Sequence, residues 1–144
     1  MEIATFSALF VMLVIVGTDV CLASIASTVN DAACKEAAHA AATADNAERA
    51  LKLAQQSAGS HQSDGFMIGA PRVTVSQFIY EDYRGRPPIN ASPYVAVTTT
   101  SEVRVPAPSL FSESIWGPEG TIIFKQRCVV PIEKSKVASR NSAS

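Results

Sequence analysis

Three cysteines and two histidines are the side chains of this 144-residue sequence that best suit redox, metal or nucleophilic chemistry. Cys34 and Cys128 lie outside the apolar N-terminal run, and they could form a disulfide if their part of the chain lies in an oxidising compartment. The alternative is a pair of buried free thiols. Cys21 lies inside the apolar run, where a packing or lipid-facing thiol is expected. The spacing of the cysteines matches no zinc-site pattern, so we predict no metal site.

The remaining candidates for chemistry lack supporting context. His39 is expected on a solvated helix face beside Lys35 and Glu36, and His61 lies in a polar segment with Asp64. The sequence contains no HExxH, Walker-type phosphate loop, GxSxG or CxxC motif. We therefore predict that the protein is not an enzyme and has no catalytic residues, no cofactor and no small-molecule substrate.

The distribution of charge is uneven along the chain. The formal net charge is −1, whereas a nucleic-acid-binding protein usually carries a basic stripe, so we expect no nucleic-acid partner. After Glu2 the next charged residue is Asp19, and the first basic residue is Lys35. The front of the chain is therefore the part that is suited to lipid.

Residues 3–26 read IATFSALFVMLVIVGTDVCLASIA and predict a transmembrane helix. About 20 apolar residues are needed to cross a bilayer as a helix. Asp19 is the only charge in this run, and a carboxylate at that depth is costly. We therefore expect Asp19 to lie near the interface or to face another helix. The alternative is a cleaved signal peptide. A signal peptide usually has basic residues before its apolar run, and this sequence has none there.

Residues 27–58 predict that the helix continues past the membrane as an amphipathic stalk. This segment is rich in Ala, Glu, Lys and Leu, and it contains no Pro or Gly before Gly59. Small apolar residues recur at alternating steps of four and three, which is typical of a heptad packing seam. The seam consists of Ala33, Ala37, Ala40, Ala44, Ala47, Leu51, Ala54 and Ala58. We expect one continuous helix over residues 1–58, about 85 Å long.

The rest of the chain predicts a small β-rich head. Residues 59–71 are expected to be a linker, residues 72–131 an antiparallel β-rich head, and residues 132–144 a disordered tail. Strands are expected at 72–80, 94–105 and 121–130, where β-branched and aromatic residues are bounded by Pro or Gly. The predicted fold class is α+β, with the long N-terminal helix packed on a small antiparallel sheet.

The N-terminal sequence resembles a known family. Its features are Glu2-Ile3-Ala4, an apolar stretch, the step Gly17-Thr18-Asp19, and the helix NDAACKEAAHAA at residues 30–41. Together they resemble the TadE-like pseudopilins, or minor pilins, of tight-adherence (Flp) pilus systems. The resemblance covers about the first 42 residues. Cys34-Lys35 and His39 stand where the family usually has Arg.

The resemblance implies a pilin-like structural subunit that takes part in assembling a Flp or type IV-like pilus. It implies a single-pass protein of the bacterial inner membrane with an extracytoplasmic head, able to enter a surface pilus. The implied partners are other pilin or pseudopilin subunits, including copies of this chain, and the pilus assembly machinery. Glu2 resembles the pilin glutamate that acts in assembly; the alternative is a carboxylate that is simply favourable at a membrane edge and at the start of a helix. Asp19 is the second candidate assembly residue, through a contact with a partner helix in the membrane, unless it lies at the interface. Family precursors carry a short basic leader that a prepilin peptidase removes, so we expect the native chain to start upstream of Glu2.

One apolar cluster between the last two predicted strands admits two interpretations. It is either a loop that completes the core or a contact patch for a partner, with the single Trp as its anchor. The cluster consists of Leu110, Phe111, Ile115 and Trp116. At the level of the whole protein, two alternatives to the pilin interpretation stay open: a membrane-tethered extracytoplasmic binding module, and a secreted β-rich domain left after signal cleavage.

Overall fold

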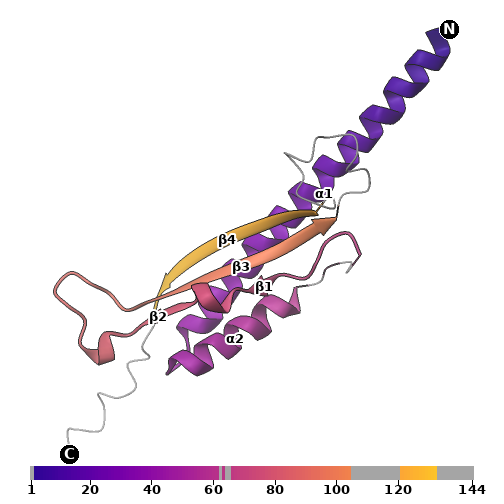
Figure 1. Ribbon diagram of the computed structural model, residues 1–144. Coiled ribbons are helices and arrows are strands. Elements are labelled where there is room, and N and C mark those ends of the chain that lie inside the picture. The colour runs from indigo at the N-terminus through magenta and orange to yellow at the C-terminus, as the bar shows by residue number, and fades with distance from the viewer. Residues whose placement is uncertain (1, 62, 64–65, 105–120, 133–144) are drawn as a thin grey trace, which may run out of the picture.

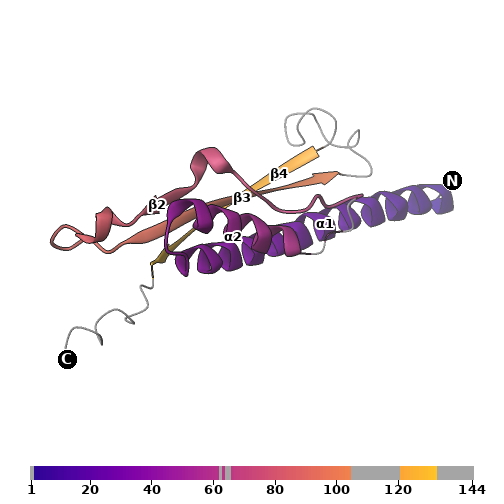
Figure 2. The same cartoon turned by 90° about the horizontal axis from the view of Figure 1, so that it is seen from below.

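A computed structural model of the chain describes residues 2–61, 63, 66–104 and 121–132. Helices α1 (Glu2–Ala42) and α2 (Ala47–Ser60) form one layer, and a four-stranded antiparallel sheet forms the other. The C-terminal half of α1 runs along the sheet, while its N-terminal half projects well beyond it (Figure 1). Viewed from below, both helices cover the same face of the sheet (Figure 2). The predicted α+β class is confirmed.

The prediction of one continuous helix over residues 1–58 is wrong. Helix α1 ends at Ala42, and α2 begins at Ala47 after a four-residue turn. Asn46 is the N-cap of α2, with extended backbone angles and a side-chain oxygen that accepts from the backbone N–H of Arg49 at 2.9 Å. Asn is among the best N-cap residues because its side chain competes with the backbone for helical hydrogen bonds. Asn46 therefore caps a second helix that begins at Ala47, although no Pro or Gly lies between the two helices.

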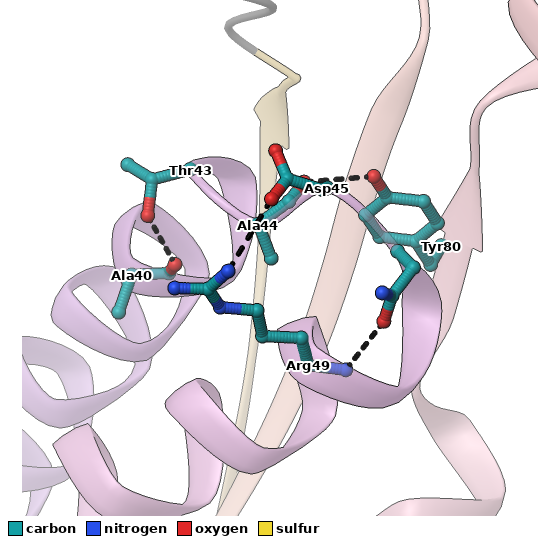
Figure 3. Close-up of polar contacts among 7 residues, drawn as sticks. Ala40, Thr43, Ala44, Asp45, Arg49 and Tyr80 are labelled. Carbon is teal, nitrogen blue, oxygen red and sulfur yellow. Dashed lines mark hydrogen bonds and ion pairs between the residues drawn. The ribbon is translucent and has the colours of Figure 1, made fainter.

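The turn is held by a tertiary contact that the local sequence does not contain. The hydroxyl of Tyr80 donates to the carbonyl oxygen of Ala44 at 2.9 Å, as Figure 3 shows. The hydroxyl of Thr43 donates to the carbonyl of Ala40 at 2.8 Å, so this carbonyl at the end of α1 also has a partner. These contacts let α2 fold back along α1 instead of extending it.

The turn also changes which alanines form the packing seam. Of the predicted seam, Ala47 is exposed, Ala40 and Leu51 are half-buried, and the other five positions are buried. The break shifts the helical phase, so the buried face of α2 is Ala50, Ala54 and Ala58. In full, the buried alanines of this region are Ala33, Ala37, Ala38, Ala41, Ala42, Ala44, Ala50, Ala54 and Ala58. They form the contact between the two helices and between both helices and the sheet.

The central strand of the sheet is β3 (Tyr94–Arg104), which pairs along its whole length with β4 (Thr121–Pro131). On its other side β3 pairs with β1 (Arg72–Val73) and β2 (Ile79–Glu81). The strands predicted at 94–105 and 121–130 are thus confirmed to within a residue. The strand predicted at 72–80 is interrupted by a 3₁₀ turn at Val75–Gln77, so its two ends pair with β3 separately.

The predicted linker is partly built into the sheet. Ile68 forms a bridge with Val103, and the backbone N–H of Gly69 donates to the carbonyl oxygen of Glu102 at 2.7 Å. A Cβ at position 69 would lie 3.2 Å from that oxygen, a contact tight enough that a larger residue would have to push the strand back by a few tenths of an ångström. Beyond β4, Ile132 donates its N–H to the carbonyl of Pro93 at 2.9 Å. The first residue of the predicted tail is therefore ordered, and residues 133–144 lie outside the described part.

Two apolar clusters join the helices to the sheet. The larger one combines the buried alanines with Val95 and Val97, and the half-buried Phe78 and Tyr80 pack against it. The smaller one lies nearer the projecting half of α1 and is built on Ala26, Ile68 and Val103, with Leu22 and Phe124 at its edge. Because the side chains on α1 are small, its backbone can lie close to the strands.

Helices α1 and α2 form a helical hairpin, and this hairpin makes a prediction that one continuous helix does not. Ala54→Leu should lower the free energy of unfolding by about 1–3 kcal/mol, because Ala54 is fully buried between the helices and the added atoms overpack the contact. Ala47→Leu should change it by less than about 0.5 kcal/mol, because Ala47 is exposed. Urea unfolding followed by circular dichroism measures both. Equal losses from the two variants would contradict the hairpin.

Candidate functional site: the projecting half of helix α1

The N-terminal half of α1 is apolar on every side. Residues 9–14 are six consecutive large apolar residues, and all are exposed. Six residues make more than one helical turn, so this segment has no polar face. A helix that is apolar all round needs lipid or other apolar helices around it. The helix over residues 3–42 is long and apolar enough to cross a membrane, with a mean hydropathy of 2.4 in its most apolar window.

Leu22 and Ala26 pack with Val103 at the end of β3. Asp19, one turn before Leu22, is already buried. The part of α1 from Ile3 to Cys21 precedes the contact with β3, and its 19 residues span about 28 Å as a helix. This length matches the ~30 Å hydrocarbon thickness of a bilayer. The last residues of the predicted span of 3–26 are packed against protein at Leu22 and Ala26.

Asp19 is a buried carboxylate at this boundary. Its side chain is 1% exposed, and neither carboxylate oxygen has a hydrogen-bond partner within the described part of the chain. It lies on the same side of the helix as Ala26, Asn30 and Ala33, because the spacings of seven, four and three follow the helical repeat. Asp19 therefore faces the side of α1 that carries the head. Burying an unpaired carboxylate costs free energy, so this position is poorly explained as a passive part of an anchor.

Asn30 attaches α1 to both long strands. Its side-chain amide donates to the carbonyl oxygen of Phe124 on β4 at 3.3 Å, and its backbone carbonyl accepts from the hydroxyl of Thr99 on β3 at 3.3 Å. Asn30 is 1% exposed. The sequence analysis missed this role. The available signal was a single amide residue on the buried face of an otherwise alanine-rich helix, one turn before Cys34.

Cys34 continues this row of contacts. It is fully buried, and its Sγ donates to the carbonyl oxygens of Val97 at 3.4 Å and Gln126 at 3.3 Å. Cys128 is paired with Val97 in the sheet and is half-buried against the larger core cluster. Burial raises the pKa of Cys128 to about 12, and a hydrogen bond with the thiol of Cys34 adds to the shift. The structure thus places Cys34 over the strand pair that carries Cys128, with both thiols free, and leaves Cys21 exposed on the projecting half of α1.

The two histidines belong to no group of metal-ligating side chains among the described residues. His61 donates from Nε2 to the carboxylate of Glu36 at 3.1 Å and so links the end of α2 to α1, a contact that the sequence analysis did not predict. His39 is exposed, as expected. Lys35 pairs with Asp31 at 2.6 Å, and this hydrogen bond raises the pKa of Lys35. Within the described residues, no group of three His, Cys, Asp or Glu side chains could hold a metal ion.

Two predicted sites cannot be placed in the structure. Glu2 is the first residue of α1, but its side chain lies outside the described part. The apolar cluster at Leu110, Phe111, Ile115 and Trp116 lies outside the described residues altogether. The interpretations given for both stay predictions.

Comparisons of the chain with protein-family models, with curated proteins and with solved structures found no match. The function must therefore be argued from the residues and their geometry.

The burial of Asp19 has a measurable consequence for stability. Asp19→Asn keeps the shape of the side chain and removes the charge, so we expect the free energy of unfolding at pH 7 to rise by about 1 kcal/mol or more. Thermal unfolding of the full chain in detergent, followed by circular dichroism, measures the change. The control is Asp31→Asn, which removes only a surface ion pair and should change stability by less than about 1 kcal/mol. A clear loss of stability in Asp19→Asn would contradict an unpaired carboxylate.

Proposed function

We propose that this protein is a membrane-anchored, pilin-like structural subunit of the TadE type that takes part in assembling a Flp or type IV-like pilus. The observation that carries the proposal is the continuity of α1 between two environments. One helix, Glu2–Ala42, is apolar all round in its first half and forms part of the core of the head in its second half. In this proposal the first half lies in the bacterial inner membrane and the head is extracytoplasmic.

Continuity distinguishes a packed subunit from a simple tether. A tethered domain needs only a flexible linker between its anchor and its fold. Here the structure has no linker between them, and Ala33, Ala37 and Ala41 of the same helix pack inside the head. The head is therefore held in one orientation relative to the apolar half. A fixed orientation is what a subunit needs if its helix and its head are to contact neighbours at the same time.

The proposed mechanism is packing, not chemistry. In the bilayer, lipid surrounds the apolar residues of α1; in an assembly, the same residues contact the helices of other subunits. This exchange replaces one apolar environment with another, so it gains little from the hydrophobic effect and depends on polar and shape-specific contacts. Asp19 is buried where the apolar half meets the head and has no hydrogen-bond partner among the described residues, which makes it a suitable polar group for such a contact. Glu2 has the corresponding role at the start of the helix.

The outer face of the sheet favours a second candidate, a membrane-tethered binding module. The odd-numbered residues of β3 face the helices, so its even-numbered residues and their partners lie on the other side of the sheet. Arg72, Lys125 and Arg127 are each paired with an even-numbered residue of β3 and therefore lie on that outer side. Arg104 is also on this side. All four are exposed, and they outnumber the acidic residues on the same side, Glu81 and Glu102, so the face has a net positive charge that suits an anionic ligand.

Photo-crosslinking tests the proposal. A photoreactive amino acid at Phe10 on the projecting half, in the full chain expressed in membranes of its own host, should capture other small proteins with apolar N-terminal helices, or further copies of this chain. Asp19→Asn should reduce these products at least several-fold while leaving the head folded. The same probe at Lys52, exposed on α2, is the control for chance contacts.

Other outcomes contradict the proposal. Capture of lipid alone at Phe10, together with crosslinks from position 127 on the sheet face, would favour the tethered binding module. Intact mass and N-terminal sequencing of the same sample provide an independent check. A mature N-terminus near residue 25 would remove the anchor and leave a secreted β-rich domain, whereas a processed N-terminus upstream of Glu2 supports the pilin-type pathway.

A further inference from the structure

The thiols of Cys34 and Cys128 meet across the contact between α1 and the sheet. Cys34 Sγ lies 3.4 Å from the carbonyl oxygen of Val97 and 3.3 Å from that of Gln126. Val97 is the residue paired with Cys128, and Gln126 precedes Cys128 by two positions on the same side of β4. The sulfur of Cys34 therefore lies over the ladder next to Cys128. Both side chains belong to the layer between helix and sheet, since Cys34 is fully buried and Cys128 packs against the larger core cluster.

We propose that Cys34 and Cys128 form an intramolecular disulfide in the mature protein, which attaches helix α1 covalently to strand β4. The proposal rests on the extracytoplasmic position of the head given in the proposed function, because disulfides persist in oxidising compartments. The oxidant is a disulfide of a thiol oxidoreductase or of glutathione. One cysteine thiolate attacks that disulfide, and the second then displaces the mixed-disulfide partner. The S–S bond of the protein forms, two protons are lost, and two electrons reduce the oxidant to two thiols.

The burial of the pair determines when this oxidation happens. In the folded, reduced head the thiol of Cys128 is held in its protonated form, with its pKa raised to about 12. The thiolate is the attacking species, so the folded thiol reacts slowly at neutral pH. The disulfide therefore forms most readily while the head is folding, and because Cys34 is fully buried the folded head slows its reduction until the protein unfolds. Cys21 is exposed on the apolar half of α1 and takes no part.

The disulfide would attach strand β4, the outer of the two long strands, to helix α1. Within the described part of the chain, β4 is paired only with β3, so one of its edges has no strand partner. Joining Cys128 to Cys34 closes a loop of 94 residues, and closing a long loop restricts the unfolded chain strongly. The sheet would then stay on the helix even when a force acts along α1.

Peptide mapping of the full chain tests the pairing. The protein is purified in detergent without reductant in a Cys21→Ser background, alkylated, unfolded and digested with trypsin. No Lys or Arg precedes Lys35, and Arg127 directly precedes Cys128, so the two cysteines fall in separate peptides. We expect one crosslinked pair of peptides, lighter by two hydrogen atoms than the sum of the two. Alkylation of both cysteines would overturn the proposal.

Thermal unfolding provides a structural readout. Reductant should lower the melting temperature of the Cys21→Ser protein by about 10 °C, given the length of the closed loop. Adding Cys34→Ser should abolish this sensitivity, while the serine hydroxyl can still donate to the carbonyls of Val97 and Gln126. A melting temperature that does not respond to reductant in either protein would overturn the proposal.

A second sample separates this proposal from the proposed function. The unfolded, reduced protein is refolded in detergent with oxidised glutathione, which does not depend on the compartment. A disulfide formed in this sample but absent from protein taken from native membranes shows that the two thiols can pair, but it overturns the disulfide in the mature protein and contradicts the extracytoplasmic position of the head. Free thiols in both samples overturn the pairing and leave the pilin proposal intact.

Discussion

The close contact between helix α1 and strands β3 and β4 is the constraint on which the rest of this structure depends. Because the buried residues of α1 are mostly alanines, its backbone lies near enough to the sheet for Asn30 and Cys34 to reach main-chain carbonyls on the strands. Larger residues would lift the helix away and break these hydrogen bonds. The same contact determines where α2 can return, where the head starts to cover α1, and on which side Asp19 lies.

The contact also connects the two halves of the molecule mechanically. An α-helix transmits rotation and displacement along its axis because each turn is hydrogen-bonded to the next. The apolar half of α1 therefore cannot turn without turning the head. This rigid coupling fits a subunit whose neighbours are chosen by helix and head together, and it gives a reason for a buried carboxylate at the junction. In the proposed assembly, a polar group at the junction lowers the stability of the isolated subunit. It becomes favourable only when a neighbouring subunit supplies a hydrogen-bond or charge partner.

The strands and the helical face show what local patterns predict well. The runs that became β3 and β4 are rich in β-branched and aromatic residues and are bounded by Pro or Gly, so their limits were predicted to within a residue. The helix break was missed because the absence of Pro and Gly in residues 27–58 was given more weight than Asp45-Asn46, which is a strong cap signal. The same error placed Ala47 in the packing seam, although it is exposed. A spacing pattern cannot be continued across a break in the helix, because the second helix starts with a new rotation about its own axis.

The sequence by itself determined the composition of each environment: a run of apolar residues long enough to span a bilayer, an alanine-rich helix with a packing face, and a β-rich head. These features depend on residues close together in the chain. Only the tertiary structure decided that α2 folds back, that Asp19 is buried with no hydrogen-bond partner among the described residues, and that Cys34 lies over the strand pair that carries Cys128. Each of these depends on contacts between segments far apart in the sequence, such as Tyr80 with Ala44, and neither hydropathy nor spacing encodes which distant segments will meet.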